Sequence, residues 1–287
     1  METLENQYLI AKINPVGAEL KSLVFKPTHN EIIWQGNDEF WNRSAPILFP
    51  FVGKLRENSY QYGNKIYKMD QHGFARDQPF EVVKNTGDKI TLRLSENPET
   101  YKNYPFKFEL FVTYFLTENT ITTTFLVNNT HPAQPLLFSL GGHPAFNVDL
   151  MPISNYQLIF NKPDKLERHL LIDGLFSGET ESLKLKNQGL KLTEDLFSND
   201  ALVFKNLKTT FLKLENLEAD YSIEFEFNNF PYLGIWKKPN APFICLEPWC
   251  GLADNIEFTE QLIDKEGINV LNFGEIFTRS YSITPSL

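Results

Sequence analysis

The sequence predicts an all-β protein built mainly of antiparallel strands and arranged as a sandwich or a barrel. Apolar and charged residues alternate along segments 90–94, 106–110 and 223–227, which places one side of each segment in a core and the other in water. The chain contains 25 phenylalanines, and aromatic residues favour half-buried sheet surfaces. Turn-forming residues recur between the apolar segments at close spacing, as expected for many short strands.

In chain order, nine further segments have the composition of strands. They are 8–13, 19–25, 81–84, 120–127, 136–140, 156–160, 211–214, 243–246 and 277–283. Turns are expected at 14–17 (NPVG), 62–64 (YGN) and 86–88 (TGD), because these residue types favour chain reversal. The one candidate helix, 95–103, is interrupted by Pro98. The more polar segment 161–199 is expected to form loops and short edge hairpins.

The composition is that of a soluble globular protein and argues against several partners. The formal net charge of −9 disfavours nucleic acid, because binding to a phosphate backbone needs a basic face. The negative net charge does not exclude a small anionic substrate, since arginines near the binding site can make the local charge positive. No apolar segment approaches the length of a membrane span, so no membrane association is expected. The sequence leaves the oligomeric state open.

Residues 1–7 are polar and acidic, without the basic and apolar regions of a secretory signal. We therefore expect a cytoplasmic protein, in which Cys245 and Cys250 are reduced thiols. A pair of cysteines with four residues between them, and no second pair nearby, is weak support for a metal site. We expect no metal and no cofactor.

Three short polar segments stand out: 71–76 (QHGFAR), 141–147 (GGHPAFN) and 245–250 (CLEPWC). Each places one residue that can transfer a proton among small or aromatic neighbours at the end of a strand-like segment. Two histidines and a glutamate can act together as acid and base, and Trp249 and Phe146 offer flat surfaces for a sugar ring. No compositional break marks a linker, and the segments span the chain. If they converge, the chain folds as a unit, so we expect a single domain spanning 1–287.

His143 and Glu247 are the candidate catalytic residues. His143 follows two glycines that permit a sharp turn and a close backbone approach, although a lone histidine is more often a half-buried structural residue. Glu247 lies in a very apolar segment, where burial would raise its pKa toward the range of a general base. A buried ion pair is the alternative for this carboxylate. We expect Pro248 to end the strand and leave Glu247 at its edge.

His72, Arg56 and Arg76 are candidate binding residues. Arg76 follows His72 by four residues, and its planar guanidinium can bind paired hydroxyls or a phosphate. Arg56 lies in a similar segment, 53–58 (GKLREN). For both arginines the alternative is a charged loop in contact with solvent.

Together these segments resemble the aldose 1-epimerase (galactose mutarotase) family, and within it the LacX-like and hexose-6-phosphate-epimerase-like branch. The segments that carry the resemblance are 71–76, 142–147 and 246–249, with weaker support from 17–23 (GAELKSL) and 273–275 (FGE). They occur in the family's order and cover nearly the whole chain.

The resemblance implies a β-supersandwich, a single large domain of mostly antiparallel strands with an open cleft. It also implies an activity that interconverts the α and β anomers of a hexose. By resemblance Glu247 would be the general base and His143 the general acid, while His72 and Arg56 would hold the sugar. The residue types suit this chemistry independently, because a carboxylate and an imidazole can occupy complementary protonation states near neutrality.

One departure from the family leaves the substrate open. Galactose-type members carry an additional acidic residue on the strand before the glutamate, and the corresponding segment here, 228–236, contains no carboxylate. Trp236 offers a stacking surface there instead. Arg76 is shared with the sugar-phosphate branch, and with Arg56 it would form a cationic spot suited to phosphate. An arginine at position 56 is also used for neutral sugars, so both an aldohexose and a hexose 6-phosphate remain, with the free sugar slightly favoured.

Three competing functions are weighed against this one. A non-catalytic carbohydrate-binding protein would use the same aromatic residues and arginines but would not need an acid and a base together. A glycoside hydrolase needs two carboxylates across the bond, and Asp254 is the only weak second candidate beside Glu247. A metal-dependent β-barrel enzyme would place histidines at closer spacing than His72 and His143.

Overall fold

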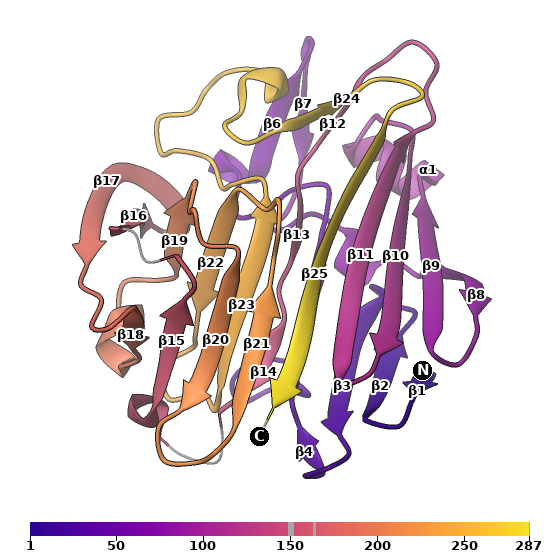
Figure 1. Ribbon diagram of the computed structural model, residues 1–287. Helices are drawn as coiled ribbons and strands as arrows, with labels where there is room; N and C mark the ends of the chain where they lie inside the picture. The colour runs from indigo at the N-terminus through magenta and orange to yellow at the C-terminus, as the bar shows by residue number, and fades with distance from the viewer. Residues whose placement is uncertain (149–151, 163–164, 287) are drawn as a thin grey trace.

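The computed structural model describes residues 1–148, 152–162 and 165–286, and it confirms the predicted all-β class. Two antiparallel sheets of nine and eight strands dominate, accompanied by a four-stranded sheet and two short strand pairs. The nine-stranded sheet crosses the molecule in Figure 1, with the eight-stranded sheet behind one half and the four-stranded sheet behind the other. Buried side chains from all three sheets form one large hydrophobic cluster.

The nine-stranded sheet joins strands from the middle and the end of the chain. Its order is β18 (Gly189–Lys191), β15 (Tyr156–Phe160), β20 (Phe211–Asn216), β21 (Ser222–Glu226), β25 (Ile276–Ser286), β11 (Thr120–Asn129), β10 (Phe108–Thr117), β9 (Lys89–Ser95) and β8 (Glu81–Asn85).

The eight-stranded sheet carries most of the predicted site. Its order is β17 (Leu175–Leu183), β16 (Leu166–Ile172), β19 (Leu202–Lys205), β22 (Tyr232–Trp236), β23 (Phe243–Cys250), β13 (Leu140–Gly142) and β5 (Ile47–Leu48), with β14 (Ala145–Asn147) also paired to β23. The four-stranded sheet consists of β1 (Glu2–Glu5), β2 (Leu9–Asn14), β3 (Glu19–Phe25) and β4 (Asn30–Glu31). The short pairs are β6 (Ser59–Tyr62) with β7 (Lys65–Lys68), and β12 (Leu136–Phe138) with β24 (Asn269–Leu271).

The alternating pattern in the sequence produces the strands as expected. In β10 and β11, buried residues alternate with more exposed ones, and the two strands pair without a break from Phe108 with Asn129 to Thr117 with Thr120. A two-residue turn at 118–119 joins them, with Glu118 at a φ of 51°. Every segment predicted as a strand overlaps a strand of the structure.

The predicted helix differs from expectation at its start. Helix α1 (Pro98–Asn103) begins at Pro98, whereas the sequence predicts an interruption at this proline. Proline is tolerated in the first turn because its missing N–H has no helical partner there. The Asn97 side chain caps the helix by accepting hydrogen bonds from the backbone N–H groups of Glu99 and Thr100. No helix in the described part of the chain has the length and apolarity needed to cross a membrane.

The other helical elements in the described residues are five short 3₁₀ turns. They are η1 (Arg56–Asn58), η2 (Ala75–Asp77), η3 (Ile153–Asn155), η4 (Glu194–Phe197) and η5 (Leu262–Asp264). In the polar segment 161–199, of which 163–164 lie outside the described residues, the chain forms the β16–β17 edge hairpin, β18 and η4. This agrees with the expected loops and edge hairpins.

Pro248 does not end its strand, which corrects the sequence prediction. Strand β23 continues to Cys250, and Glu247 lies inside it, opposite Gly234 of β22. On its other side β23 pairs with β14 up to Cys245 and with β13 from Trp249 onward. In the gap between them the Leu246 N–H donates to the Pro144 carbonyl. Because backbone direction alternates, Pro248 faces the same gap, where no ladder bond needs its missing N–H.

Candidate active site

The three polar segments converge on one open cavity of about 560 Å³. Six of the residues predicted for the site line it: His72, Arg76, His143, Trp236, Glu247 and Trp249. They come from loops near β5 and η2, from the connection between β13 and β14, and from β22 and β23. The cavity therefore combines residues separated by most of the length of the chain.

His143 enters the cavity through the gap between β13 and β14. The two glycines before it are required by close packing, because a Cβ at Gly141 would lie 2.6 Å from Trp249 Cδ1. A Cβ at Gly142 would lie 2.8 Å from Tyr281 Cε1 in the nine-stranded sheet. The chain thus passes tightly between the two sheets and presents the imidazole where β23 has no neighbouring strand.

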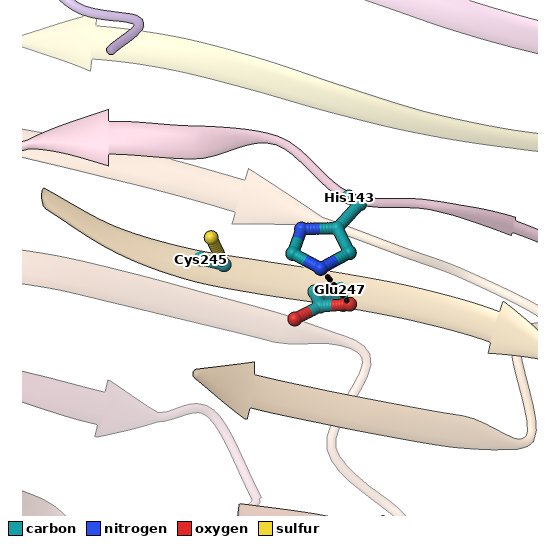
Figure 2. A group of neighbouring side chains, drawn as sticks. All are labelled: His143, Cys245 and Glu247. Carbon is teal, nitrogen blue, oxygen red and sulfur yellow. Dashed lines mark ion pairs between the residues drawn. The ribbon is translucent and has the colours of Figure 1, made fainter. Parts of the chain in front are cut away.

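Glu247 meets His143 at this gap. Its side chain is almost fully buried, and Oε2 lies 3.0 Å from Nε2 of His143. Figure 2 marks this contact with a dashed line. Gly234, opposite Glu247 in β22, leaves room for the Trp249 ring, since a Cβ there would lie 2.5 Å from Trp249 Cη2.

Burial favours the uncharged form of both partners. Burial is the main cause that lowers the pKa of His143 to about 3, and the positive charges of Arg76 and Arg43 lower it further. Burial raises the pKa of the Glu247 carboxyl well above its ordinary value, the negative charge of Asp200 adds to the rise, and Trp249 opposes it. Burial therefore favours the form of the pair in which Glu247 holds the proton and His143 is uncharged.

His72 is held in one orientation beside this pair. Its Nδ1 accepts a hydrogen bond from the Gly53 N–H at 3.1 Å, and the His72 and His143 rings meet edge to face with centroids 5.6 Å apart. Burial lowers the pKa of His72 well below its ordinary value, and His143, Arg76 and Arg43 add to the effect. A neutral imidazole that accepts at Nδ1 carries its proton on Nε2, which lies 3.3 Å from the side-chain amide of Gln71.

The two predicted arginines have different positions. Arg76 lies in η2, lines the cavity, and donates through Nη2 to the Gln71 carbonyl at 2.7 Å. Arg56 is not among the residues that line the cavity. Its guanidinium instead donates to the Phe258 carbonyl at 3.3 Å and lies 3.5 Å from Glu57. The structure therefore does not join Arg56 and Arg76 in one cationic spot.

Phe146 also lies outside the cavity. On β14 its side chain is fully buried and packs edge to face on Phe225 of the nine-stranded sheet, with ring centroids 5.8 Å apart. The two-residue period of a strand directs it into the core, away from the face that carries Glu247. It has no surface to offer a sugar in this structure.

Several lining residues were not predicted from the sequence. Trp41 covers His143, with ring centroids 4.9 Å apart, and it also contacts Trp236. Lys54, Gln71, Asp173 and Asp200 add polar groups to the wall. Asp200 supplies a carboxylate close enough to act on Glu247, although it lies before β19 and not in the segment 228–236 where one was sought. Its φ of 78°, unusual for a residue other than glycine, had no signal in the sequence.

Comparison with known proteins matches the whole chain to a family. The sequence model described as aldose 1-epimerase matches residues 2–284. The chain belongs to the aldose 1-epimerase family. The LacX protein encoded on the chromosome of Lactococcus lactis subsp. lactis is 32% identical, with 98% of each chain covered. The family resemblance inferred from the three polar segments is thereby confirmed.

Solved structures agree with this assignment. A galactose mutarotase-like protein from Lactobacillus casei is 35% identical and superposes with a TM-score of 0.94, with all of both chains covered. A galactose mutarotase related enzyme from Lactobacillus acidophilus is 33% identical, with a TM-score of 0.95 over 100% of this chain and 97% of that one. This aldose 1-epimerase family member thus has the galactose mutarotase-like fold that the sequence predicted.

Asp254, the weak second carboxylate considered for a hydrolase, serves another purpose in this family member. Its Oδ1 lies 2.6 Å from Nζ of Lys265, and both side chains are buried. Its Oδ2 accepts the Arg56 backbone N–H at 2.9 Å. The carboxylate is thus neutralised and does not line the cavity. Asp254 is therefore not available as the second catalytic carboxylate that a common glycoside hydrolase needs.

Proposed function

We propose that this protein is an aldose 1-epimerase that interconverts the α and β anomers of an aldohexose by acid–base ring opening. The observation that carries the proposal is the buried His143–Glu247 pair, with 3.0 Å between Nε2 and Oε2, in the wall of an open cavity lined by tryptophans. Membership of the family supports the reaction type. The assignment of this substrate and these roles is ours.

In the proposed reaction Glu247 removes the proton of the C1 hydroxyl while His143 protonates the ring oxygen. The C1 carbonyl forms as the bond between C1 and the ring oxygen breaks, which gives the open-chain aldehyde. Rotation about the C1–C2 bond presents the other face of the carbonyl, and closure reverses both proton transfers. The overall reaction is isomerisation, so no redox partner is consumed.

The protonation state of the pair suits a reversible step. Burial favours the neutral pair, whereas the proposed opening begins with an ionised Glu247 and a protonated His143. Both forms contain one proton, so passing between them moves that proton between two atoms 3.0 Å apart and needs no exchange with solvent. We infer that the polar groups of a bound sugar stabilise the charged form of the pair.

The remaining wall is assigned to binding. Trp236 and Trp249 offer apolar faces to the ring, and His72 and Arg76 offer hydrogen-bond donors. The lining contains the cations Lys54 and Arg76 and the carboxylates Asp173 and Asp200. With Arg56 directed elsewhere, this balance favours a free hexose over a hexose 6-phosphate.

The test is the rate of anomer exchange measured by NMR on glucose, galactose and their 6-phosphates, with Glu247→Gln as the matched control. The proposal expects catalysed exchange that is lost in the variant. A non-catalytic carbohydrate-binding protein would instead quench or enhance tryptophan fluorescence on adding sugar, with exchange no faster than in buffer. That second result would reject the enzymatic function.

A further inference from the structure

The acid–base chemistry uses His143 and Glu247 but leaves their neighbour Cys245 without a role. Cys245 and Glu247 lie two residues apart on β23, so their side chains share one face of the strand. His143 approaches the same face from the β13–β14 connection, as Figure 2 shows. One nitrogen, one sulfur and one oxygen from the three residues lie within 4.8 Å of one another.

These three atoms form the ligand set that zinc prefers. Imidazole nitrogen, thiolate sulfur and carboxylate oxygen bind Zn²⁺ at about 2.0–2.3 Å, so tetrahedral ligand atoms lie about 3.3–3.8 Å apart. The three atoms lie within 4.8 Å of one another, so binding requires side-chain rotations that bring them about 1 Å closer together. Hard cations such as Mg²⁺ and Ca²⁺ prefer sets made only of oxygen, so the thiol selects against them.

The cluster is also buried and has unused coordinating capacity. His143 is 6% exposed, Cys245 0% and Glu247 1%. Among the described residues, no donor meets Oε2 of Glu247 in hydrogen-bond geometry, although His143 Nε2 lies 3.0 Å away. A buried polar atom without a hydrogen-bond donor is unfavourable, and a cation that takes the place of the proton of the His143–Glu247 pair would remove that penalty.

We propose that His143, Cys245 and Glu247 form a binding site for a thiophilic divalent cation such as Zn²⁺. Three protein ligands leave a fourth position, which faces the cavity because His143 and Glu247 both line it. The carboxylate of Asp200 adds a negative charge near the site, while Arg76 opposes the cation. A cation bound here coordinates both His143 and Glu247, so it prevents these residues from transferring protons to a sugar. This consequence, unlike the cation site itself, rests on the proposed function.

The test uses Co²⁺ as a spectroscopic probe of the full-length protein. Binding through Cys245 gives a thiolate-to-cobalt charge-transfer band in the near ultraviolet and d–d bands typical of low coordination number. Cys250, on the same strand and outside the cluster, provides the matched control. We expect the bands in the unmodified protein and in Cys250→Ser, displacement of Co²⁺ by Zn²⁺, and no charge-transfer band in Cys245→Ser.

Affinity is measured in parallel by competition of Zn²⁺ with a chromophoric chelator. Cys245→Ser should weaken Zn²⁺ binding by ~100-fold or more. Loss of a residue that only hydrogen-bonds to a metal ligand already costs roughly 10–100-fold in metal affinity, and this variant removes a ligand itself. Cys245→Ala is the second variant if the serine protein does not fold, as judged by circular dichroism. Absence of the charge-transfer band, or equal affinity in Cys245 and Cys250 variants, would overturn the site.

These readouts separate the cation site from the proposed function because neither requires sugar turnover. Cobalt binding without anomer exchange would uphold the site and reject the epimerase. Anomer exchange without cobalt binding would reject the site and leave the epimerase standing. If both hold, Zn²⁺ should inhibit exchange in the unmodified protein and in Cys250→Ser but far less in Cys245→Ser.

Discussion

Trp41 covers the imidazole of His143, with ring centroids 4.9 Å apart and planes inclined at 34°. Two hydrogen bonds from other parts of the chain fix the loop that carries Trp41. Trp34 Nε1 donates to the Trp41 carbonyl at 2.9 Å, and Lys238 Nζ donates to the Phe40 carbonyl at 2.7 Å. The contact keeps solvent from one face of His143 and restricts its rotation, so the loop contributes to the state of the acid–base pair.

Removal of this ring should therefore slow the reaction without abolishing it. An aromatic pair contributes ~0.5–1.5 kcal/mol beyond its buried area, which corresponds to a loss of about 2–10-fold in kcat. We expect that loss in Trp41→Ala, while Trp41→Phe retains most of the activity. Steady-state anomerisation by coupled assay measures both. Equal losses of activity in Trp41→Ala and Trp41→Phe would show that the aromatic ring over His143 does not account for the effect.

Replacement of the acid–base pair should have a much larger effect. Glu247→Gln keeps the shape of the side chain and removes the base, so anomerisation should be abolished while sugar binding is largely retained. His143→Asn should lower turnover by ~10²–10⁴-fold, the usual contribution of a positioned acid or base. Polarimetry gives the rates, and tryptophan fluorescence titration gives sugar affinity. Near-normal turnover in either variant would mean that the roles are misassigned.

The charge of the substrate can be tested at Arg76. Arg76 lines the cavity and Arg56 does not, so we expect glucose to be turned over at least as well as glucose 6-phosphate. Arg76→Ala should reduce both rates, because it removes a donor to the cavity wall. Rates for both sugars are compared in the two proteins by NMR exchange. A phosphate preference that disappears in Arg76→Ala would instead establish this arginine as a phosphate ligand.

Much of this site was predictable because its polar residues interrupt an apolar strand pattern. His72, His143 and Glu247 stand beside glycine or proline, and the structure brings all three to one cavity. Phe146 was misplaced because the direction of a side chain depends on strand register, which the sequence does not display over a three-residue strand. Arg56 was misplaced because its partners, Phe258 and Glu57, are set by loop geometry.

The residues that sequence reasoning missed depend on tertiary contacts. Asp200 and Trp41 lie in irregular connections whose paths no periodic pattern encodes. Pro248 was expected to end a strand on its local preference, but the gap between β13 and β14 accommodates it. Short strands such as β5 and β14 have too few residues to show a period at all. The prediction of a single domain over 1–287 stays a prediction.

The pH dependence of stability should report the state of His72. Burial lowers the pKa of His72 in the folded protein well below its ordinary value of 6.5. At a pH between these two pKa values, His72 is protonated in the unfolded chain but not in the folded protein. Unfolding is then favoured as the pH falls, and His72 contributes up to about 1.4 kcal/mol of lost stability per pH unit. His72→Asn should reduce that slope between pH 6.5 and 5, as measured by urea unfolding. His29→Asn, at an exposed position, is the matched control, and equal slopes in the two variants would contradict the assignment.

The last prediction concerns the buried ion pair of Asp254 and Lys265, which supports the rim of the cavity. Asp254 accepts the Arg56 N–H through its side chain, donates its own N–H to the Lys54 carbonyl, and accepts the Phe176 N–H. It thus connects two loops and β17, and Lys54 and Phe176 both line the cavity. Burial lowers the pKa of Lys265, and Asp254 opposes that shift, so the lysine charge depends on its partner.

Lys265→Met should therefore leave a buried carboxylate without a counterion and destabilise the fold by about 3–5 kcal/mol. The double variant Lys265→Met/Asp254→Asn removes the charge but keeps an acceptor for the Arg56 N–H, so it should recover most of the loss. Urea unfolding measures both proteins, and anomer exchange reports whether the rim keeps its shape. If the double variant is as unstable as Lys265→Met, the uncompensated charge is not the cause, and packing of the lysine stem must account for the loss.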